Sequence, residues 1–206
     1  MSTALFVLAG YLAGSIPFGY WIARGLKGVD IRTRGSGNIG ATNVWRTFGR
    51  HYGLPVVLLD TAKGFAPALL ATIFAGHLAG VLAGAAAMLG HWRPLFMRFE
   101  KGGKMVATCG GAFLGLAPYV GLLGAAVWLV AFGAIRYVSV ASMTAALSLP
   151  VLAVALGEPW PVIAFAAAAA AGVVVLHRAN IQRLRAGTES RASLRRRKRE
   201  AIGAGP

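Results

Sequence analysis

Seven apolar stretches recur along this chain, separated by short polar or basic segments. They lie at 5–22, 54–74, 78–95, 106–116, 120–135, 140–156 and 162–176. A helix needs about 20 mostly apolar residues to cross a bilayer. We therefore predict an all-α integral membrane protein with seven transmembrane helices. The fourth and fifth stretches are short, which suggests tilted, broken or partly buried segments, because irregular backbone at membrane depth must be buried in protein or line a cavity.

The basic residues predict how this protein is oriented. With 57% hydrophobic and 13% charged residues, the chain has too few charges for an ordinary soluble domain. Its 21 Lys and Arg fall at 24–50, 93–104, Arg136 and 178–199, with Lys63 as the exception. Because these segments follow every second crossing, the positive-inside rule places the N-terminus outside the cytoplasm and the C-terminus inside it. The net charge of +15 is thus explained by topology, and we predict no nucleic-acid partner.

The chain is predicted to form one domain. We assign residues 1–190 to a single polytopic catalytic domain and 191–206 to a basic cytoplasmic tail, expected to be disordered and drawn to the anionic inner leaflet. The first apolar stretch lacks a preceding basic region, so we interpret it as a retained span and not as a cleaved signal. The single cysteine, Cys109, excludes an internal disulfide and a cysteine-based zinc site. No metal or cofactor is predicted.

A Gly-rich polar segment, RGSGNIGATNVWR at 34–46, separates the first two apolar stretches. Glycine-rich loops expose backbone N–H groups that bind anions, polar side chains add hydrogen bonds, and an arginine fork matches phosphate oxygens. The candidate phosphate ligands are Arg34, Gly35, Ser36, Gly37, Asn38, Gly40, Thr42, Asn43 and Arg46. The alternative is a polar turn between two helices.

A second loop, Lys101–Gly102–Gly103–Lys104, leads directly into the fourth apolar stretch. Glycines before a helix expose N–H groups at its positive end, and lysine adds a full charge, so an anion is favoured there. The pattern GxxxxGK[ST] of a Walker A loop is absent. The alternative is a basic turn that binds lipid headgroups.

Polar residues also occur inside or at the ends of the apolar stretches. Asp60 and Lys63 lie three residues apart on one helical face, which favours a salt bridge; intramembrane charges are also functional candidates. Ser142 follows Arg136 near the cytoplasmic face. His177 and Asn180 share a helical face and are candidate phosphate ligands or proton carriers, although a lone histidine is more often structural.

These segments resemble the bacterial membrane glycerol-3-phosphate acyltransferases that use acyl phosphate as donor. The similarity covers nearly the whole chain and is carried by GSIPFGY at 14–20, GSGNIGATNVWR at 35–46, LDTAKG at 59–64, GH at 90–91, KGGK and VAT within 101–108, RYVSVAS at 136–142 and HRANIQRLRAGTE at 177–189. The family pattern FKGGKGVAT reads FEKGGKMVAT here, so Glu100 is an extra residue and Met105 replaces a common glycine.

The resemblance implies an inner-membrane enzyme with its active site facing the cytoplasm. Its reaction transfers an acyl group to the 1-hydroxyl of glycerol 3-phosphate and releases phosphate, as the first step of phospholipid synthesis, and it implies a functional link to an enzyme that makes acyl phosphate. By resemblance, Ser36, Arg46, Lys104, His177 and Asn180 are catalytic, and Gly102 and Gly103 help hold the acceptor. Lys101 and Ser142 are expected to bind substrate, and Asp60, Lys63 and Glu189 to be structural.

The reaction requires two anions to share one pocket, so several cations and N–H donors are needed there. Either His177 or a substrate phosphate oxygen takes the proton of the hydroxyl group, and we favour the phosphate.

Other functions are also compatible with the sequence. A transporter of an anionic metabolite is the main alternative. A metal-dependent lipid phosphotransferase is a weaker one, because Asp30, Asp60 and Glu100 are scattered, and a non-catalytic scaffold is the third.

Overall fold

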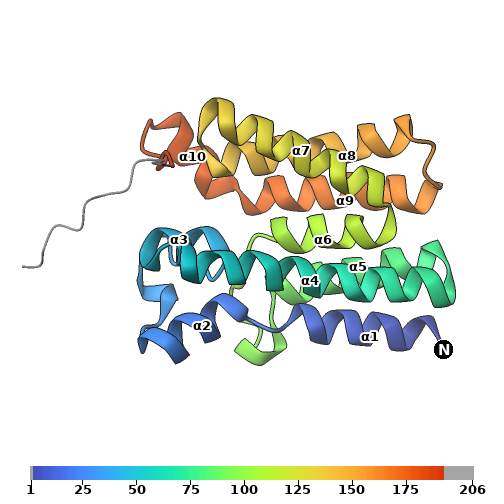
Figure 1. Ribbon diagram of the computed structural model, residues 1–206, viewed down its shortest axis with the longest axis horizontal. Helices are drawn as coiled ribbons and strands as arrows, with labels where there is room; N and C mark the ends of the chain where they lie inside the picture. Colours follow the sequence, from blue (N-terminus) through green and yellow to red (C-terminus); the bar gives the residue numbers. More distant parts are fainter. Residues whose placement is uncertain (1, 193–206) are drawn as a thin grey trace, which may run out of the picture.

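The computed structural model describes residues 2–192, which form helices and turns and no strand (Figure 1). The helices are α1 (Thr3–Gly14), α2 (Phe18–Lys27), α3 (Ala41–Phe48), α4 (Arg50–Ala75), α5 (His77–Trp92), α6 (Val106–Leu116), α7 (Pro118–Ile135), α8 (Val138–Ala155), α9 (Trp160–Leu176) and α10 (Arg178–Arg185), with 3₁₀ turns η1 (Ile31–Thr33) and η2 (Leu95–Met97). All seven predicted apolar stretches are helical. The predicted tail lies, from residue 193 on, outside the described residues.

The first predicted helix is broken in two. Residues 15–17 separate α1 from α2, and Pro17 prevents a continuous helix because it has no N–H to donate. The carbonyl of Ile16 accepts a hydrogen bond from Lys63 Nζ at 2.8 Å. A lysine from α4 therefore satisfies backbone that the break exposes.

Small residues let the helices of the N-terminal half approach closely. A Cβ added to Gly14 in α1 would overlap the carbonyl of Ala87 in α5, and one added to Gly64 in α4 would overlap the carbonyl of Thr108 in α6. Lipid tails are as apolar as the side chains, so the hydrophobic effect does not drive helices together in a bilayer, and close van der Waals packing does so instead. These contacts fix α1, α4, α5 and α6 as one packed unit.

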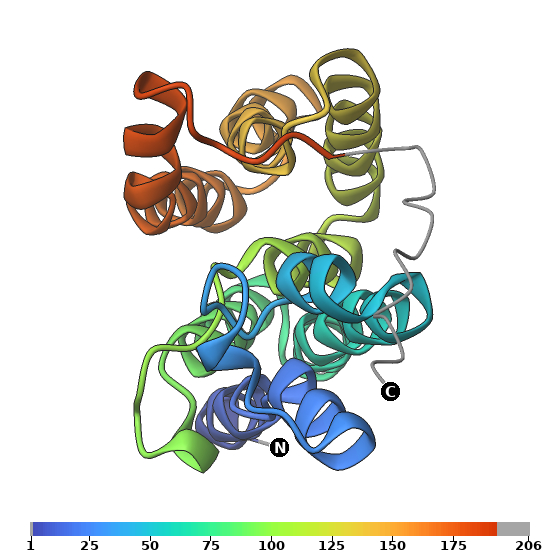
Figure 2. The same ribbon diagram turned by 90° about the vertical axis from the view of Figure 1, so that its left-hand side faces the viewer.

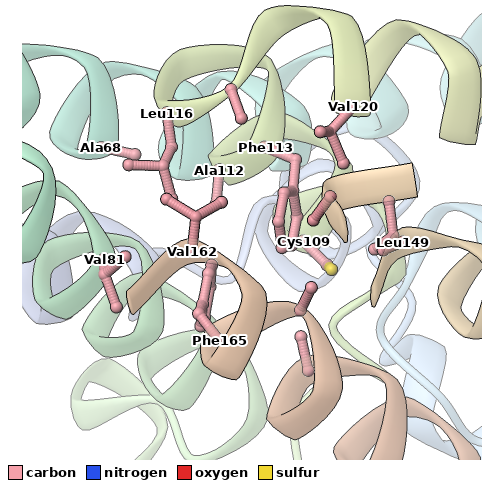
Figure 3. Packing of buried hydrophobic residues seen from close by; sticks show 14 of the residues in the cluster. Ala68, Val81, Cys109, Ala112, Phe113, Leu116, Val120, Leu149, Val162 and Phe165 are labelled. Carbon is pink, nitrogen blue, oxygen red and sulfur yellow. The ribbon is translucent and has the colours of Figure 1, made fainter. Parts of the chain in front are cut away.

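Helix α6 connects this unit to the C-terminal helices. Its Phe113 is fully buried and stacks on Phe165 of α9, with ring centroids 5.1 Å apart. Val120 of α7 and Leu149 of α8 belong to the same buried cluster (Figure 3). The short fourth stretch is therefore largely buried, as predicted. The fifth stretch differs, because α7 is an unbroken helix of 18 residues and only 17% of them are buried.

The number of crossings is only partly determined by helix length. Within residues 2–192, four segments are long and apolar enough to span a membrane, namely Thr3–Lys27, Arg50–Ala75, Pro118–Ile135 and Val138–Ala155, and a fifth is obtained if α9 and α10, bent by 55°, count as one. Helices α5 and α6 have 16 and 11 residues. The chain is a multi-pass membrane protein, and seven crossings remain a prediction.

The basic loops gather at one end of the helical bundle. Helices α2, α3 and α10 lie at this end, and α1 begins at the other (Figure 1). Figure 2 faces this end, and the segment before α3, the segment before α6 and residues 186–192 all lie on it. Segments far apart in sequence are thus available to form one site.

Two differences from the predicted boundaries affect the loops at the site. The 34–46 segment was expected to be a loop, but its second half begins α3, whose N-cap is Gly40. The third stretch, expected to reach residue 95, ends at Trp92, since Pro94 disfavours helical geometry in the residue before it. The polar segment between the first two spans therefore contains a short helix.

Candidate active site

Asn43 organises the first loop from inside. Its side chain is buried, its Nδ2 donates to the carbonyls of Arg34 (3.0 Å) and Asn38 (2.8 Å), and its Oδ1 accepts from the N–H of Ser36 (3.0 Å). Gly35, with a φ of 55°, lies so close that a Cβ would overlap Asn43 Oδ1. Asn43, predicted to bind substrate, is therefore committed to holding the loop in shape, while Ser36 stays exposed.

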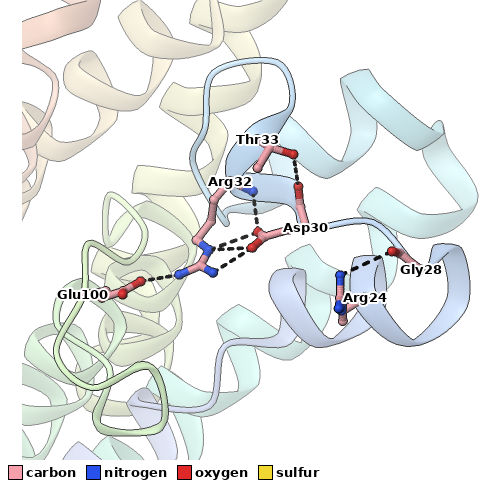
Figure 4. Close-up of polar contacts among 6 residues, drawn as sticks. All are labelled: Arg24, Gly28, Asp30, Arg32, Thr33 and Glu100. Carbon is pink, nitrogen blue, oxygen red and sulfur yellow. Dashed lines mark hydrogen bonds and ion pairs between the residues drawn. The ribbon is translucent and has the colours of Figure 1, made fainter.

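Two contacts join the first loop to the second. Asn38 Nδ2 donates to the carbonyl of Gly102 at 3.2 Å, and its Oδ1 accepts from the N–H of Gly40 at 2.8 Å. Arg32 pairs with Asp30 at 2.7 Å and also with Glu100, the residue before the second loop (Figure 4). Because Glu100 is 59% exposed, its ion pair is worth less than about 1 kcal/mol. This ion pair therefore contributes little stability.

The second loop is pinned against the end of α5. The N–H groups of Gly102 and Gly103 donate to the carbonyls of Trp92 (2.8 Å) and His91 (2.9 Å). A Cβ on Gly103 would overlap the ring of His91. These glycines are therefore required for close approach, and their N–H groups, predicted to hold an anion, are used by α5.

Beneath this loop lies a buried ionic cluster. Asp60 Oδ1 is 2.8 Å from Lys63 Nζ and 3.7 Å from His91 Nδ1, and all three side chains are at most 4% exposed. The predicted salt bridge between Asp60 and Lys63 is present, and the buried ring of His91 lies beside it. Through His91, the cluster supports Gly103 from below.

A chain of hydrogen bonds runs from Lys104 to the end of the described chain. Lys104 Nζ donates to Asn180 Oδ1 at 2.5 Å, and Asn180 Nδ2 donates to Glu189 Oε1 at 2.7 Å. Glu189 also accepts from Ser139 at 2.8 Å and from Arg183 Nε at 2.7 Å. The carboxylate of Glu189 thus links α8 to α10 through these hydrogen bonds.

The last described residues cross the site and are held at two places. Arg46 of α3 donates to the carbonyl of Ser190 at 3.1 Å. The N–H of Ala192 donates to the carbonyl of Arg136 at 2.8 Å. Arg46, Lys104, Asn180 and Glu189 therefore meet although more than 140 positions separate Arg46 from Ser190.

His177 sits at the bend between α9 and α10. Its ring is buried, and Nδ1 lies 2.8 Å from the carbonyl oxygen of Val173. A carbonyl only accepts, so the neutral ring carries its hydrogen on Nδ1 and leaves Nε2 as an acceptor. The predicted shared helical face with Asn180 holds only in part, because His177 ends one helix and Asn180 belongs to the next.

The charges around Lys104 are mostly positive. Burial, together with the positive charges of Arg183, Lys101 and Arg46, lowers the pKa of Lys104 to about 8, and the negative charge of Glu189 partly opposes this shift. Burial raises the pKa of Glu189. Hydrogen bonds from Asn180, Ser139 and Arg183 outweigh this effect and hold the pKa below its ordinary value. A single carboxylate among several cations leaves the site ready for an anion.

Ser142 is another predicted site residue whose polar group is bonded within the protein. It is buried in α8, and its hydroxyl accepts from Trp128 Nε1 of α7 at 3.1 Å. Arg183 and Ser139 were outside the predicted set, and their hydrogen bonds to Glu189 place them at the site.

Within residues 2–192, no group of three or more His, Cys, Asp or Glu side chains is placed to hold a metal ion.

An apolar groove adjoins the polar site. It encloses about 290 Å³ between α5, α9 and the start of α6, and its lining is almost entirely apolar. Met105 and Leu176 line it, and they are the direct neighbours of Lys104 and His177. The groove therefore begins where the polar residues end.

Comparison with known proteins agrees with this arrangement. Residues 4–187 match the family model described as glycerol-3-phosphate acyltransferase. Curated glycerol-3-phosphate acyltransferases include one from Desulforudis audaxviator, 45% identical over 95% of this chain and 98% of the relative, and one from Roseiflexus sp., 50% identical over 90% and 93%.

Two solved structures are similar throughout. Both are crystal structures of PlsY, an integral membrane glycerol 3-phosphate acyltransferase, in glycerol 3-phosphate and lysophosphatidic acid forms. Each is 44% identical and covers 94% of this chain and 96% of its own, with TM-scores of 0.89 and 0.87. On this evidence the chain belongs to the glycerol-3-phosphate acyltransferase family.

Proposed function

We propose that this acyltransferase takes its acyl group from acyl phosphate and transfers it to the 1-hydroxyl of glycerol 3-phosphate, releasing lysophosphatidate and inorganic phosphate. The observation that carries the proposal is the cationic cluster of Arg46, Lys101, Lys104 and Arg183 around one carboxylate, Glu189. Two phosphate-bearing substrates repel each other, and this excess of positive charge offsets their repulsion.

The proposed reaction needs little covalent help from the protein. The hydroxyl oxygen forms a bond to the acyl carbonyl carbon, the bond from that carbon to the phosphate oxygen breaks, and the hydroxyl proton ends on the released phosphate. Lys104 and Arg46 neutralise the phosphates and orient them, and holding the hydroxyl about 3 Å from the carbonyl supplies much of the rate. His177 Nε2, as an acceptor, binds a hydroxyl of glycerol 3-phosphate.

The family match, and not the fold alone, favours an enzyme over the transporter considered as the alternative. For topology we propose seven crossings, with α5 and α6 completing two of them and the basic end in the cytoplasm of a bacterial inner membrane. Support comes from the basic loops at one end of the bundle and the positive-inside rule. An enzyme that makes acyl phosphate is the proposed functional partner.

The donor is tested directly with purified protein in a lipidic medium containing EDTA. Glycerol 3-phosphate is supplied with either palmitoyl phosphate or palmitoyl coenzyme A, and lysophosphatidate is quantified. We expect product from palmitoyl phosphate. Product from the thioester alone would refute the proposed donor while leaving the acyltransferase activity intact.

Activity should fall on the alkaline side as Lys104 loses its proton. The kcat/KM for glycerol 3-phosphate reports groups of the free enzyme, and the pKa of Lys104 is about 8. The charged, phosphate-binding form predominates below pH 8, is half populated near pH 8 and declines about tenfold per pH unit well above it. In Lys104→Arg the guanidinium stays charged, so the decline in kcat/KM should move to higher pH. If kcat/KM of this variant still declines near pH 8, the decline belongs to another titrating group.

Replacing His177 separates binding from proton transfer. In His177→Ala we expect the KM for glycerol 3-phosphate to rise about tenfold while kcat changes less than about threefold, as for loss of uniform binding. Steady-state kinetics in both substrates measure this. A kcat lowered by a factor of about 10² or more with little change in KM would instead make His177 the general base.

A further inference from the structure

The polar site and the apolar groove share consecutive residues. Lys104 faces Asn180, and the next residue, Met105, lines the groove. Likewise His177 belongs to the polar site, and the preceding residue, Leu176, lines the groove. If phosphate lies at Lys104, as the proposed function requires, the acyl carbons closest to the carbonyl lie beside Met105.

The groove extends away from the site along two helices. On α9 its lining runs from Leu176 to Phe165, a distance of about 16 Å at the usual helical rise. Leu89 and Val175, which also line it, are 50% and 58% exposed. Because these exposed residues face lipid in a membrane protein, an acyl chain can enter the groove sideways.

Met105 takes an unusual backbone conformation at the start of α6. Its φ is 66°, a left-handed value that L side chains rarely adopt. The side chain is nonetheless buried, with 6% exposed. Its Cε lies against Gly172 of α9, only 3.1 Å from where a Cβ on that glycine would be. The thioether therefore reaches across the groove from α6 to α9, close to the polar site.

We infer that Met105 is a specificity-determining residue that narrows the groove beside the reacting carbon. The enzyme consequently accepts straight acyl chains and discriminates against chains branched next to the carbonyl. Total chain length is set elsewhere, toward Ala85 and Phe165 at the far end of the groove. This inference rests on the proposed use of the groove by the acyl donor.

The test compares kcat/KM for three donors: palmitoyl phosphate, 2-methylpalmitoyl phosphate and lauroyl phosphate. Met105→Ala should raise the ratio of branched to straight palmitoyl donor about tenfold, the scale of one methyl group in an apolar pocket. The ratio of lauroyl to palmitoyl should stay the same. Gly172→Ala should lower the branched ratio, because its Cβ crowds Met105. Met105→Gly, suited to the left-handed backbone, replaces Met105→Ala if that variant folds poorly.

Met97→Ala is the matched control, because Met97 is a buried methionine in a different cluster; it should leave the branched ratio unaltered. An equal loss for all donors in Met105→Ala would overturn the inference and leave Met105 a packing residue. A larger effect on lauroyl than on the branched donor would also overturn it. If only coenzyme A esters serve as donors, the donor proposal fails, and the same ratios measured with those esters still decide the role of Met105.

Discussion

Replacing Lys104 with Met should lower kcat/KM for glycerol 3-phosphate by about 10³-fold, the scale for loss of one preorganised electrostatic donor. Its ammonium is fixed by Asn180 at 2.5 Å and lies among Arg183, Arg46 and Lys101. Thermal stability should change little, because the lost cation was repelled by its neighbours. Initial rates over a range of acceptor concentrations, with Tm measured in the same detergent, check both expectations.

Lys101→Met is the matched control for that experiment. Lys101 is exposed and adjacent in the same loop, so the net charge changes equally but solvent and salt screen its effect. We expect a loss smaller than about tenfold from this variant. Equal losses in the two variants would mean that only the overall charge of the loop matters, and would contradict a specific role for Lys104.

Replacing Lys63 with Met should have the largest effect on stability. Asp60 would remain as a buried charge without its partner, and breaking a buried ion pair in this way costs about 3–5 kcal/mol. The carbonyl of Ile16 would also lose its donor at the break between α1 and α2. The expected result is a strongly lowered Tm and poor yield of folded protein, measured by thermal unfolding in detergent.

The double variant Asp60→Asn with Lys63→Met distinguishes lost charge balance from lost packing. Removing both charges is far less costly than removing one, so Tm should recover by more than half. Arg50→Met is the control on the same helix, and because Arg50 is exposed its Tm should match the wild type. If the double variant were as unstable as Lys63→Met, the uncompensated charge of Asp60 would not be the cause.

The apolar stretches predicted where the long helices form, because a helix that contacts lipid needs a continuous run of apolar residues. Three polar residues of the site, Arg46, Lys104 and Asn180, were also visible in the sequence as basic or polar groups at the boundaries of apolar stretches. Long-range pairing was not visible. Nothing local in Asn38 indicates that it bonds to Gly102, or in His91 that it lies under Gly103.

Some residues that were predicted to bind substrate form hydrogen bonds within the protein instead. Asn43 was predicted to bind phosphate because it is polar and follows glycines, but its Nδ2 donates hydrogen bonds to the carbonyls of Arg34 and Asn38 in the loop. Ser142 was expected to bind substrate, but it is buried and its hydroxyl accepts a hydrogen bond from Trp128 Nε1. A polar side chain in a sequence states its hydrogen-bonding capacity, and only the fold decides whether a substrate or the backbone uses it.

We propose that one cationic site binds acyl phosphate and glycerol 3-phosphate together. The most direct measurement follows lysophosphatidate and inorganic phosphate in the same reaction, with palmitoyl phosphate, glycerol 3-phosphate and EDTA, for the wild type and for folded Arg46→Ala. We predict equal amounts of both products, dependent on glycerol 3-phosphate and lost in the variant. Phosphate release without acceptor, or full activity in Arg46→Ala, would contradict the account.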